Sequence, residues 1–171
     1  MDITMIVLRV LHIFAGVFWV GAGLMVFFVV LPFTQSAGEE GLRFGQRLLS
    51  QSKYGVYMSI AAPLNVLSGV LMYWSVSNGF RLAWLATPSG VVLTIGSLIG
   101  ICAFVVGMAV HNPTSVRLAA LGKEIAAAGG KPTPEQAQIL GKLQSRIARA
   151  GVWSMIFMII SVIGMAAARY V

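Results

Sequence analysis

Residues 3–32 read ITMIVLRVLHIFAGVFWVGAGLMVFFVVLP, a run in which only Arg9 and His12 can carry a charge. A helix needs roughly 20 consecutive apolar residues to cross about 30 Å of hydrocarbon, so Ile3–Pro32 is long enough to span a membrane. Three further runs are near that length: Gly55–Val76, Gly90–Val110 and Gly151–Ala168. The sequence therefore predicts an all-α fold, a polytopic membrane four-helix bundle in up-down order, with residues 1–171 as a single membrane domain.

The composition of the whole chain agrees with this prediction. Hydrophobic residues make up 58% of the chain and charged residues 10%, and the mean hydropathy is +0.87. Soluble domains are nearly half apolar and about a quarter charged, so this chain is too apolar for a soluble domain. Ile3–Pro32 is too long for a signal-peptide core and lacks a basic leader, so we expect it to be retained. Cys102 is the only cysteine, which excludes an intramolecular disulfide and a thiolate-rich metal site.

Basic side chains gather in the two long segments between the apolar runs, residues 33–54 and 111–150. They are Arg43, Arg47, Lys53, Arg117, Lys123, Lys131, Lys142, Arg146 and Arg149. The short segment 77–89 carries only Arg81. By the positive-inside rule, both long segments face the cytoplasm and the N- and C-termini lie outside, across a bacterial cytoplasmic membrane. The net charge of +7 then needs no nucleic-acid partner. The aromatic residues expected at the outer interface are Trp74, Trp84 and Tyr170.

The first long segment contains a predicted amphipathic helix. Ser36 and Glu39 have the spacing of a capping box, in which a hydroxyl and a carboxylate satisfy the first backbone N–H groups of a helix. Three apolar residues follow at helical spacing: Leu42, Leu48 and Leu49.

The second long segment contains two predicted helical extensions. Thr114–Ala128 continues the third apolar run and ends at a Gly-Gly pair. Thr133–Gln136 has capping-box spacing with Pro134 at the first helical position. Because no proline follows, we expect one nearly continuous helix from about Pro134 to Ala168.

One face of the first run carries the best candidate site. It comprises Arg9, His12, Gly16, Trp19 and Gly23. An ionisable residue inside a membrane helix is costly and marks a functional site by default. A b-type haem suits this face, because His12 can ligate iron and Arg9 can pair with a propionate near the surface. Gly16 and Trp19 would lie beside the flat ring. The alternative is a histidine hydrogen-bonded to a neighbouring helix, an arginine that snorkels outward, and glycines that allow close packing.

Three other residues are candidate second ligands. Met72 and Met165 fall at the level of His12 when the second and fourth runs are counted from their outer ends, although most such methionines only pack. His111 comes about 32 Å after the start of the third run, whereas His12 is about 12 Å from the outer end of the first. The two histidines therefore lie near opposite leaflets, and a haem held by both is not expected. At a helix terminus, His111 is better interpreted as a cap.

The second and third runs carry patterns of their own. The second has a polar lining: Asn65, Ser68, Gly69 and Met72. The third has a stripe of small residues: Gly96, Gly100, Ala103 and Gly107. Such stripes allow close helix packing, either inside the bundle or in a homodimer or larger membrane complex through Gly96, Gly100 and Gly107. The five acidic residues lie in tails and loops, which argues against a transporter built on a buried carboxylate.

The first run also resembles a group of small bacterial four-helix membrane proteins in three stretches: Leu11-His12-Ile13, Phe18-Trp19-Val20-Gly21 and Phe28-Val29-Val30-Leu31-Pro32. The chain is similar to the copper-resistance D (CopD-like) membrane domain, its uncharacterised relatives of similar length, and the HemJ type of protoporphyrinogen oxidase. The similarity is best over residues 8–75. His111 with Arg117-Leu118-Ala119-Ala120-Leu121 resembles the end of the third helix in the same group.

This resemblance implies site residues. In HemJ-like proteins a first-helix histidine is associated with haem b, which corresponds to His12, and a third-helix histidine corresponds to His111. The chain departs from that family where a lysine is expected after the second span, since the hairpin offers only Arg81. The copper-resistance resemblance implies histidine and methionine copper sites, but the chain lacks an outer cluster of these residues.

The leading expectation is a membrane protein that holds haem b through His12. Its role would be electron transfer, or oxidation of a hydrophobic or porphyrin-like substrate as a haem-dependent oxidoreductase. Two alternatives belong to other classes: a cofactor-free accessory or scaffold subunit, and copper or metal-ion transport.

Overall fold

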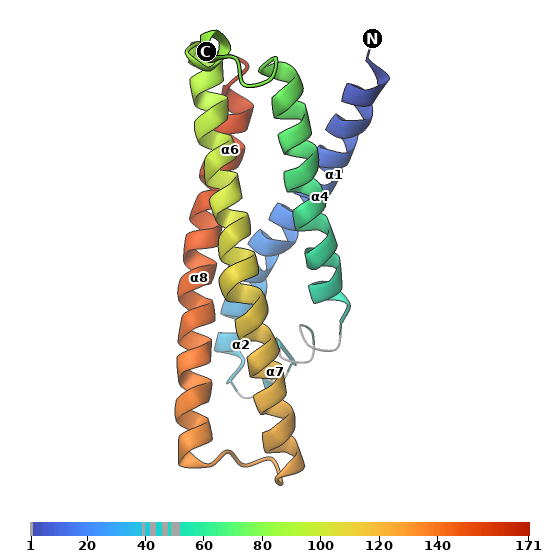
Figure 1. Ribbon diagram of the computed structural model, residues 1–171. Helices are drawn as coiled ribbons and strands as arrows, with labels where there is room; N and C mark the ends of the chain where they lie inside the picture. The colour runs from blue at the N-terminus through green and yellow to red at the C-terminus, as the bar shows by residue number, and fades with distance from the viewer. Residues whose placement is uncertain (1, 39, 42–43, 46–47, 49–51) are drawn as a thin grey trace.

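The computed structural model describes residues 2–38, 40–41, 44–45, 48 and 52–171, and these residues form helices and connecting turns. The elements are α1 (Ile3–Met25), η1 (Val26–Val30), α2 (Leu31–Ser36), α4 (Tyr54–Val76), α5 (Leu82–Leu85), α6 (Pro88–Val106), η2 (Gly107–His111), α7 (Asn112–Ala127) and α8 (Pro134–Ala167). Adjoining elements merge into four long rods, each apolar enough to cross a membrane: Ile3–Ser36, Tyr54–Val76, Pro88–Ala127 and Pro134–Ala167 (Figure 1). The predicted all-α four-helix membrane bundle is confirmed. The chain is a multi-pass integral membrane protein.

Side chains before the first turn fix where several helices begin. The Asp2 carboxylate accepts a hydrogen bond from the Thr4 N–H at 3.0 Å at the start of α1. At α8 the Thr133 hydroxyl accepts from the Gln136 N–H at 3.2 Å, and the Gln136 side chain accepts from the Thr133 N–H at 3.0 Å. This capping box, the proline after it and the single 34-residue helix that follows are all as predicted.

The prediction for Ser36 is wrong. Ser36 is the last residue of α2, and its hydroxyl donates to the Phe33 carbonyl at 3.0 Å instead of capping a new helix. The first rod continues past Pro32, so Ser36 is the C-terminal residue of one helix and not the N-cap of the next. Several residues of the predicted amphipathic helix lie outside the described residues: Glu39, Leu42, Arg43, Arg47 and Leu49.

Three prolines lie inside continuous rods, Pro32, Pro63 and Pro113, and two of them follow a π-helix. Pro32 follows the π-helix η1, and Pro113 follows the π-helix η2. In each π-turn the residue before proline bonds to the carbonyl five residues back, Leu31 to Val26 and Asn112 to Gly107. A proline ring normally clashes with the carbonyl four residues back. The wider π-turn relieves that clash, so the helix continues.

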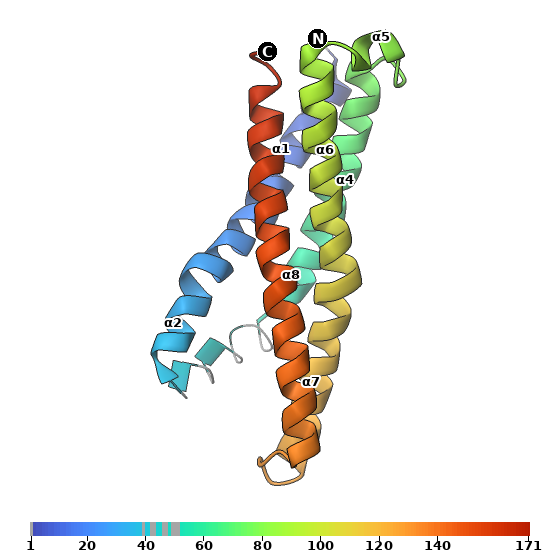
Figure 2. The same cartoon turned by 90° about the vertical axis from the view of Figure 1, so that its left-hand side faces the viewer.

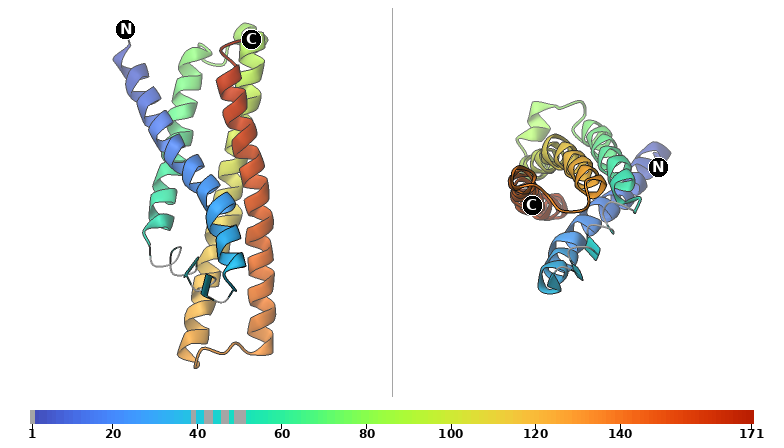
Figure 3. Two further views of the ribbon diagram at one scale, coloured as in Figure 1. Left: turned by 180° about the vertical axis from the view of Figure 1, so that it is seen from behind. Right: turned by 90° about the horizontal axis from the view of Figure 1, so that it is seen from below.

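The rods pack mainly as two pairs, α1 with α4 and α6 with α8. Figures 2 and 3 show α6 and α8 side by side along their length, while α1 is inclined to α4 and leads toward α8 at its far end. Residues from all four rods meet in one small core: Trp19, Ala61, Ala62, Ala103 and Met158.

The two ends of the bundle differ. Both chain termini and the short α5 lie at one end, and the ends of α7 and α8 that meet at their connecting turn extend beyond the other rods at the opposite end (Figures 1 and 2). The predicted extensions therefore exist as regular helices, joined by a turn in which Gly129 and Gly130 have φ values of 96° and 80°. Glycine adopts such left-handed conformations without a steric penalty.

Candidate functional site

His12 joins α1 to the middle of α4 through a reciprocal exchange of hydrogen bonds. Its Nδ1 lies 2.8 Å from the backbone oxygen of Asn65, and the Asn65 side-chain amide donates to the backbone oxygen of His12 at 2.7 Å. A carbonyl oxygen only accepts, so Nδ1 carries a proton in this contact. When the ring is neutral, Nε2 therefore keeps its lone pair. The exchange therefore sets both the tautomer and the direction of the imidazole.

Two glycines allow this close approach. A Cβ at position 69 would lie 2.8 Å from His12 Cε1, and a Cβ at position 16 would lie 2.7 Å from the Asn65 amide nitrogen. Ser68, which is 3% exposed, completes the contact with its hydroxyl 3.5 Å from His12 Nδ1. The polar lining predicted on the second run is thus the surface that receives His12.

The rest of the predicted haem face packs against protein. Trp19 belongs to the core and meets Phe104 edge to face, with ring centroids 6.3 Å apart. Gly23 faces Met158, whose sulfur lies 3.6 Å from a Cβ placed there. Together with the Asn65 amide at Gly16, these contacts match the alternative interpretation, in which the glycines serve close packing. Arg9 is exposed.

The two methionines differ in their surroundings. Met165 packs against α6, with its backbone nitrogen 3.1 Å from a Cβ placed at Gly96 and its methyl 3.7 Å from one placed at Gly100. Met72 is half-buried and lies on α4 one helical turn after Gly69, the residue that contacts His12. Of the two, Met72 is the one on the helix that receives the imidazole.

His111 lies in a separate environment. It lies beside α8, with its Cε1 3.8 Å from a Cβ placed at Gly151. The same Cβ, placed at Gly151 of α8, would lie 3.9 Å from the Cδ2 atom of Phe27 in the first rod. Phe27 comes fifteen residues after His12, about 22 Å along the helix, so the two histidines sit at different depths. Among the described residues, no three or more His, Cys, Asp or Glu side chains lie close enough together to hold a metal ion.

The small-residue stripe of α6 packs against α8 of the same chain. A Cβ at Gly164 would lie 3.1 Å from Gly96 Cα, and one at Gly100 would lie 2.7 Å from the Ser161 hydroxyl. Gly107 has no atom within 4 Å of such a Cβ among the described residues. The stripe therefore serves packing within the chain at Gly96 and Gly100.

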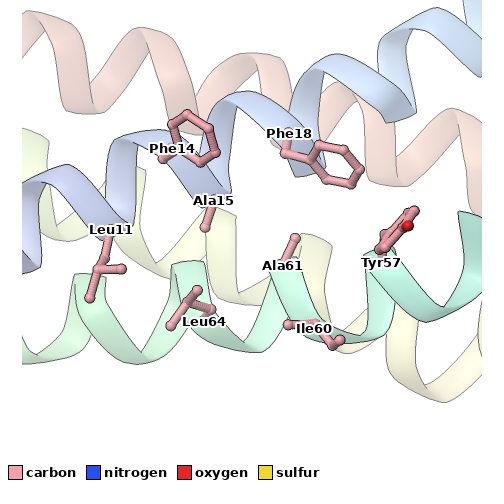
Figure 4. A pocket seen from close by; sticks show the side chains of 8 residues that line it. All are labelled: Leu11, Phe14, Ala15, Phe18, Tyr57, Ile60, Ala61 and Leu64. Atoms are coloured by element: carbon pink, nitrogen blue, oxygen red, sulfur yellow. The ribbon is translucent and has the colours of Figure 1, made fainter.

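An apolar groove along the α1/α4 contact was not predicted. It has a volume of about 270 Å³, with Ala15 and Ala61 pointing toward each other at its floor (Figure 4). Its walls are Leu11, Phe14, Phe18, Tyr57, Ile60 and Leu64. Helical spacing places the α1 residues of the groove on one face of α1 and the α4 residues on one face of α4. Only the pairing of α1 with α4 brings these two faces together.

No protein-family model, curated protein or solved structure matches this chain.

Proposed function

We propose that this membrane protein binds a b-type haem through His12 and acts in electron transfer or in oxidation of a hydrophobic or porphyrin-like substrate. The observation that carries the proposal is the contact between His12 Nδ1 and the Asn65 carbonyl. Metal-ligating histidines almost always donate their second ring N–H to a carbonyl, carboxylate or water, which orients the ring and raises its basicity. When bound, a haem iron supplies one-electron transfer.

Three residues of the chain suit the binding of a b-type haem. His12 supplies an oriented imidazole whose Nε2 has no hydrogen-bond partner among the described residues. Exposed Arg9, one turn closer to the N-terminus, supplies a cation for a propionate. Half-buried Met72 is the candidate thioether on α4. Gly16 and Gly23 are covered by other side chains, so the ring does not lie on their face. The resemblance to HemJ-type proteins points to the same histidine.

A second candidate function is a cofactor-free accessory or scaffold subunit. It is favoured by the packing of the His12 face, where Asn65 fills the notch at Gly16 and Met158 fills the notch at Gly23. In this case the exchange between His12 and Asn65 only fastens α1 to α4.

The absorption spectrum of the full chain, purified in detergent from haem-replete cells, separates the two functions. We expect a Soret band that His12→Ala abolishes or strongly shifts, because loss of an axial ligand changes the spin state and potential of the iron. His111→Ala is the matched control and should leave the band largely intact. Arg9→Ala should weaken haem retention without removing the ligand bond. A wild-type protein with no Soret band supports the accessory function, and equal loss in both histidine variants restores a bis-histidine site.

We further propose that the chain lies in the bacterial cytoplasmic membrane with both termini outside. The basic residues of the two long segments support this orientation, since positive charge accumulates on the cytoplasmic side. Ala127→Cys in a Cys102→Ala background gives a single thiol at the end of α7. It should react with a membrane-impermeant maleimide only after the cells are opened, and labelling from the periplasm alone would reverse the orientation.

A further inference from the structure

The groove between α1 and α4 presents an unusual surface to the membrane. Ala15 and Ala61 at its floor are 5% and 8% exposed, whereas Phe14 and Tyr57 on its walls are 79% and 51% exposed. The small floor residues and large wall residues make a narrow furrow of about 270 Å³. A hydrocarbon chain is thin enough for such a furrow, whereas a second helix is about 10 Å across.

The α4 side of the groove leads to a cation. Lys53, Tyr57 and Leu64 share one face of the helix, since they are spaced by four and seven residues. Lys53 is exposed, and its carbonyl accepts the Tyr57 N–H at 2.9 Å, so the two side chains are one turn apart. The distance from Lys53 to Leu64 is eleven residues, about 16 Å. One leaflet of a bilayer is about 15 Å of hydrocarbon, so this stripe runs from headgroup depth to the membrane centre.

Positive charge predominates at the Lys53 end of the groove. The segments 33–54 and 111–150, which meet the membrane at this end, contain nine Lys and Arg but four Glu. Basic residues at a membrane surface attract anionic lipids. A lipid with a negative headgroup therefore matches this end of the groove, and its chain matches the apolar part.

We propose that the α1/α4 groove binds one acyl chain of an anionic phospholipid, with the phosphate held by Lys53 and the Tyr57 hydroxyl. Lys53 supplies a charge-assisted hydrogen bond to phosphate oxygen, and Tyr57 supplies a neutral one from the edge of the groove. The chain lies over Ala15 and Ala61 between the aromatic and aliphatic walls. This site is independent of whether His12 holds a haem.

Native mass spectrometry of the delipidated full chain in detergent tests the proposal. The protein is titrated with dioleoyl phosphatidylglycerol or dioleoyl phosphatidylcholine, and the first bound lipid is counted. We expect a preference for phosphatidylglycerol that Lys53→Gln lowers about fivefold, the effect of one lysine at an anionic surface. Tyr57→Phe should lower the affinity for both lipids about two- to fivefold, through loss of one hydrogen bond to the phosphate that both headgroups carry. Both side chains are exposed, so neither variant should affect folding.

Two controls separate this site from other forms of lipid or protein binding. Lys142→Gln removes an exposed cation on α8 and should leave the preference unchanged. Dihexanoyl phosphatidylglycerol has the same headgroup with short chains and should bind at least about tenfold more weakly, because most of the apolar contact is lost. Equal binding of the two dioleoyl lipids, or an equal loss in Lys142→Gln, overturns the site in favour of diffuse attraction. Tight binding of the short-chain lipid overturns the role of the groove, as does a dimer that forms at this face without lipid.

Discussion

The two helix pairs of this bundle are held together in different ways. The α1/α4 pair is joined by hydrogen bonds between side chains and backbone, through His12 and Asn65. The α6/α8 pair is joined by direct backbone approach, with a Cβ at Gly164 placed 3.1 Å from Gly96 Cα. In lipid the hydrophobic effect does not drive helices together, so packing of small residues and interhelical hydrogen bonds take its place. Only the first of these solutions places an imidazole between two helices, and its Nε2 has no hydrogen-bond partner among the described residues.

The largest effect is expected at Gly96. In Gly96→Leu the new side chain meets the Met165 backbone nitrogen at 3.1 Å and the Ser161 carbonyl oxygen at 3.3 Å, and neither can move unless the helices separate. Overpacking of this kind should lower the free energy of unfolding in bilayers or mild detergent by about 3 kcal/mol. Gly107→Leu is the matched control on the same rod and should change it by less than about 0.5 kcal/mol. Equal tolerance at both positions would mean that α6 and α8 are not held by backbone contact.

A smaller effect is expected at Gly69, in the other pair. The Cβ of Gly69→Ala would lie 2.8 Å from His12 Cε1 and 3.1 Å from Nδ1, so the ring must move away from the Asn65 carbonyl. We expect a loss of about 2 kcal/mol in unfolding free energy and loss of the hydrogen-bonded imidazole N–H signal in NMR spectra. Gly55→Ala, at the exposed start of α4, should change neither. An unshifted imidazole signal in Gly69→Ala would show that His12 does not rest on α4.

These two sites also show what the sequence predicts well and where it falls short. The length of each rod and the cap at Thr133 depend on local chemistry, so both could be read from neighbouring residues. Asn65, Ser68 and Gly69 were recognised as a polar face, but their contact with His12 depends on the pairing of α1 with α4. Counting residues from the membrane surface does not give the direction of Met165, and Met165 packs on α6. Nothing in the residues beside Pro32 and Pro113 indicates the π-turn that lets each helix continue past its proline.

An intermediate loss of stability is expected when the reciprocal hydrogen bonds between His12 and Asn65 are removed. Each side chain bonds to the backbone of the other residue, and the backbone remains when the side chain is removed. His12→Ala and Asn65→Ala should each lower the unfolding free energy by about 1 kcal/mol, close to the range for interhelical hydrogen bonds in membranes. In the double variant the losses should add, with a coupling below about 0.5 kcal/mol.

That additivity also tests the tautomer of His12. The Asn65 amide nitrogen lies 3.4 Å from His12 Nδ1, and it can donate there only if Nδ1 carries no proton. A direct bond between the two side chains would be lost in either single variant, and the double variant would then lose less than the sum. A coupling above about 1 kcal/mol would therefore place the proton on Nε2 and weaken the case for His12 as a ligand.

The smallest effect is expected at Ser154 on α8. Ser154 and Ser68 on α4 are both buried, but only the hydroxyl of Ser68 has a hydrogen-bond partner among the described residues. Ser154 is 7% exposed, and its hydroxyl has no hydrogen-bond partner among the described residues, whereas the Ser68 hydroxyl donates to the Leu64 carbonyl at 2.6 Å. An unpaired buried hydroxyl costs about 1–3 kcal/mol, so Ser154→Ala should leave the unfolding free energy unchanged or raise it by up to about 1 kcal/mol. Ser68→Ala, the matched control, should lower it by about 0.5–1 kcal/mol. If Ser154→Ala is instead the more destabilising of the two, the α6/α8 pair contains a hydrogen bond to a bound molecule, and the contrast between a polar pair and a packed pair no longer holds.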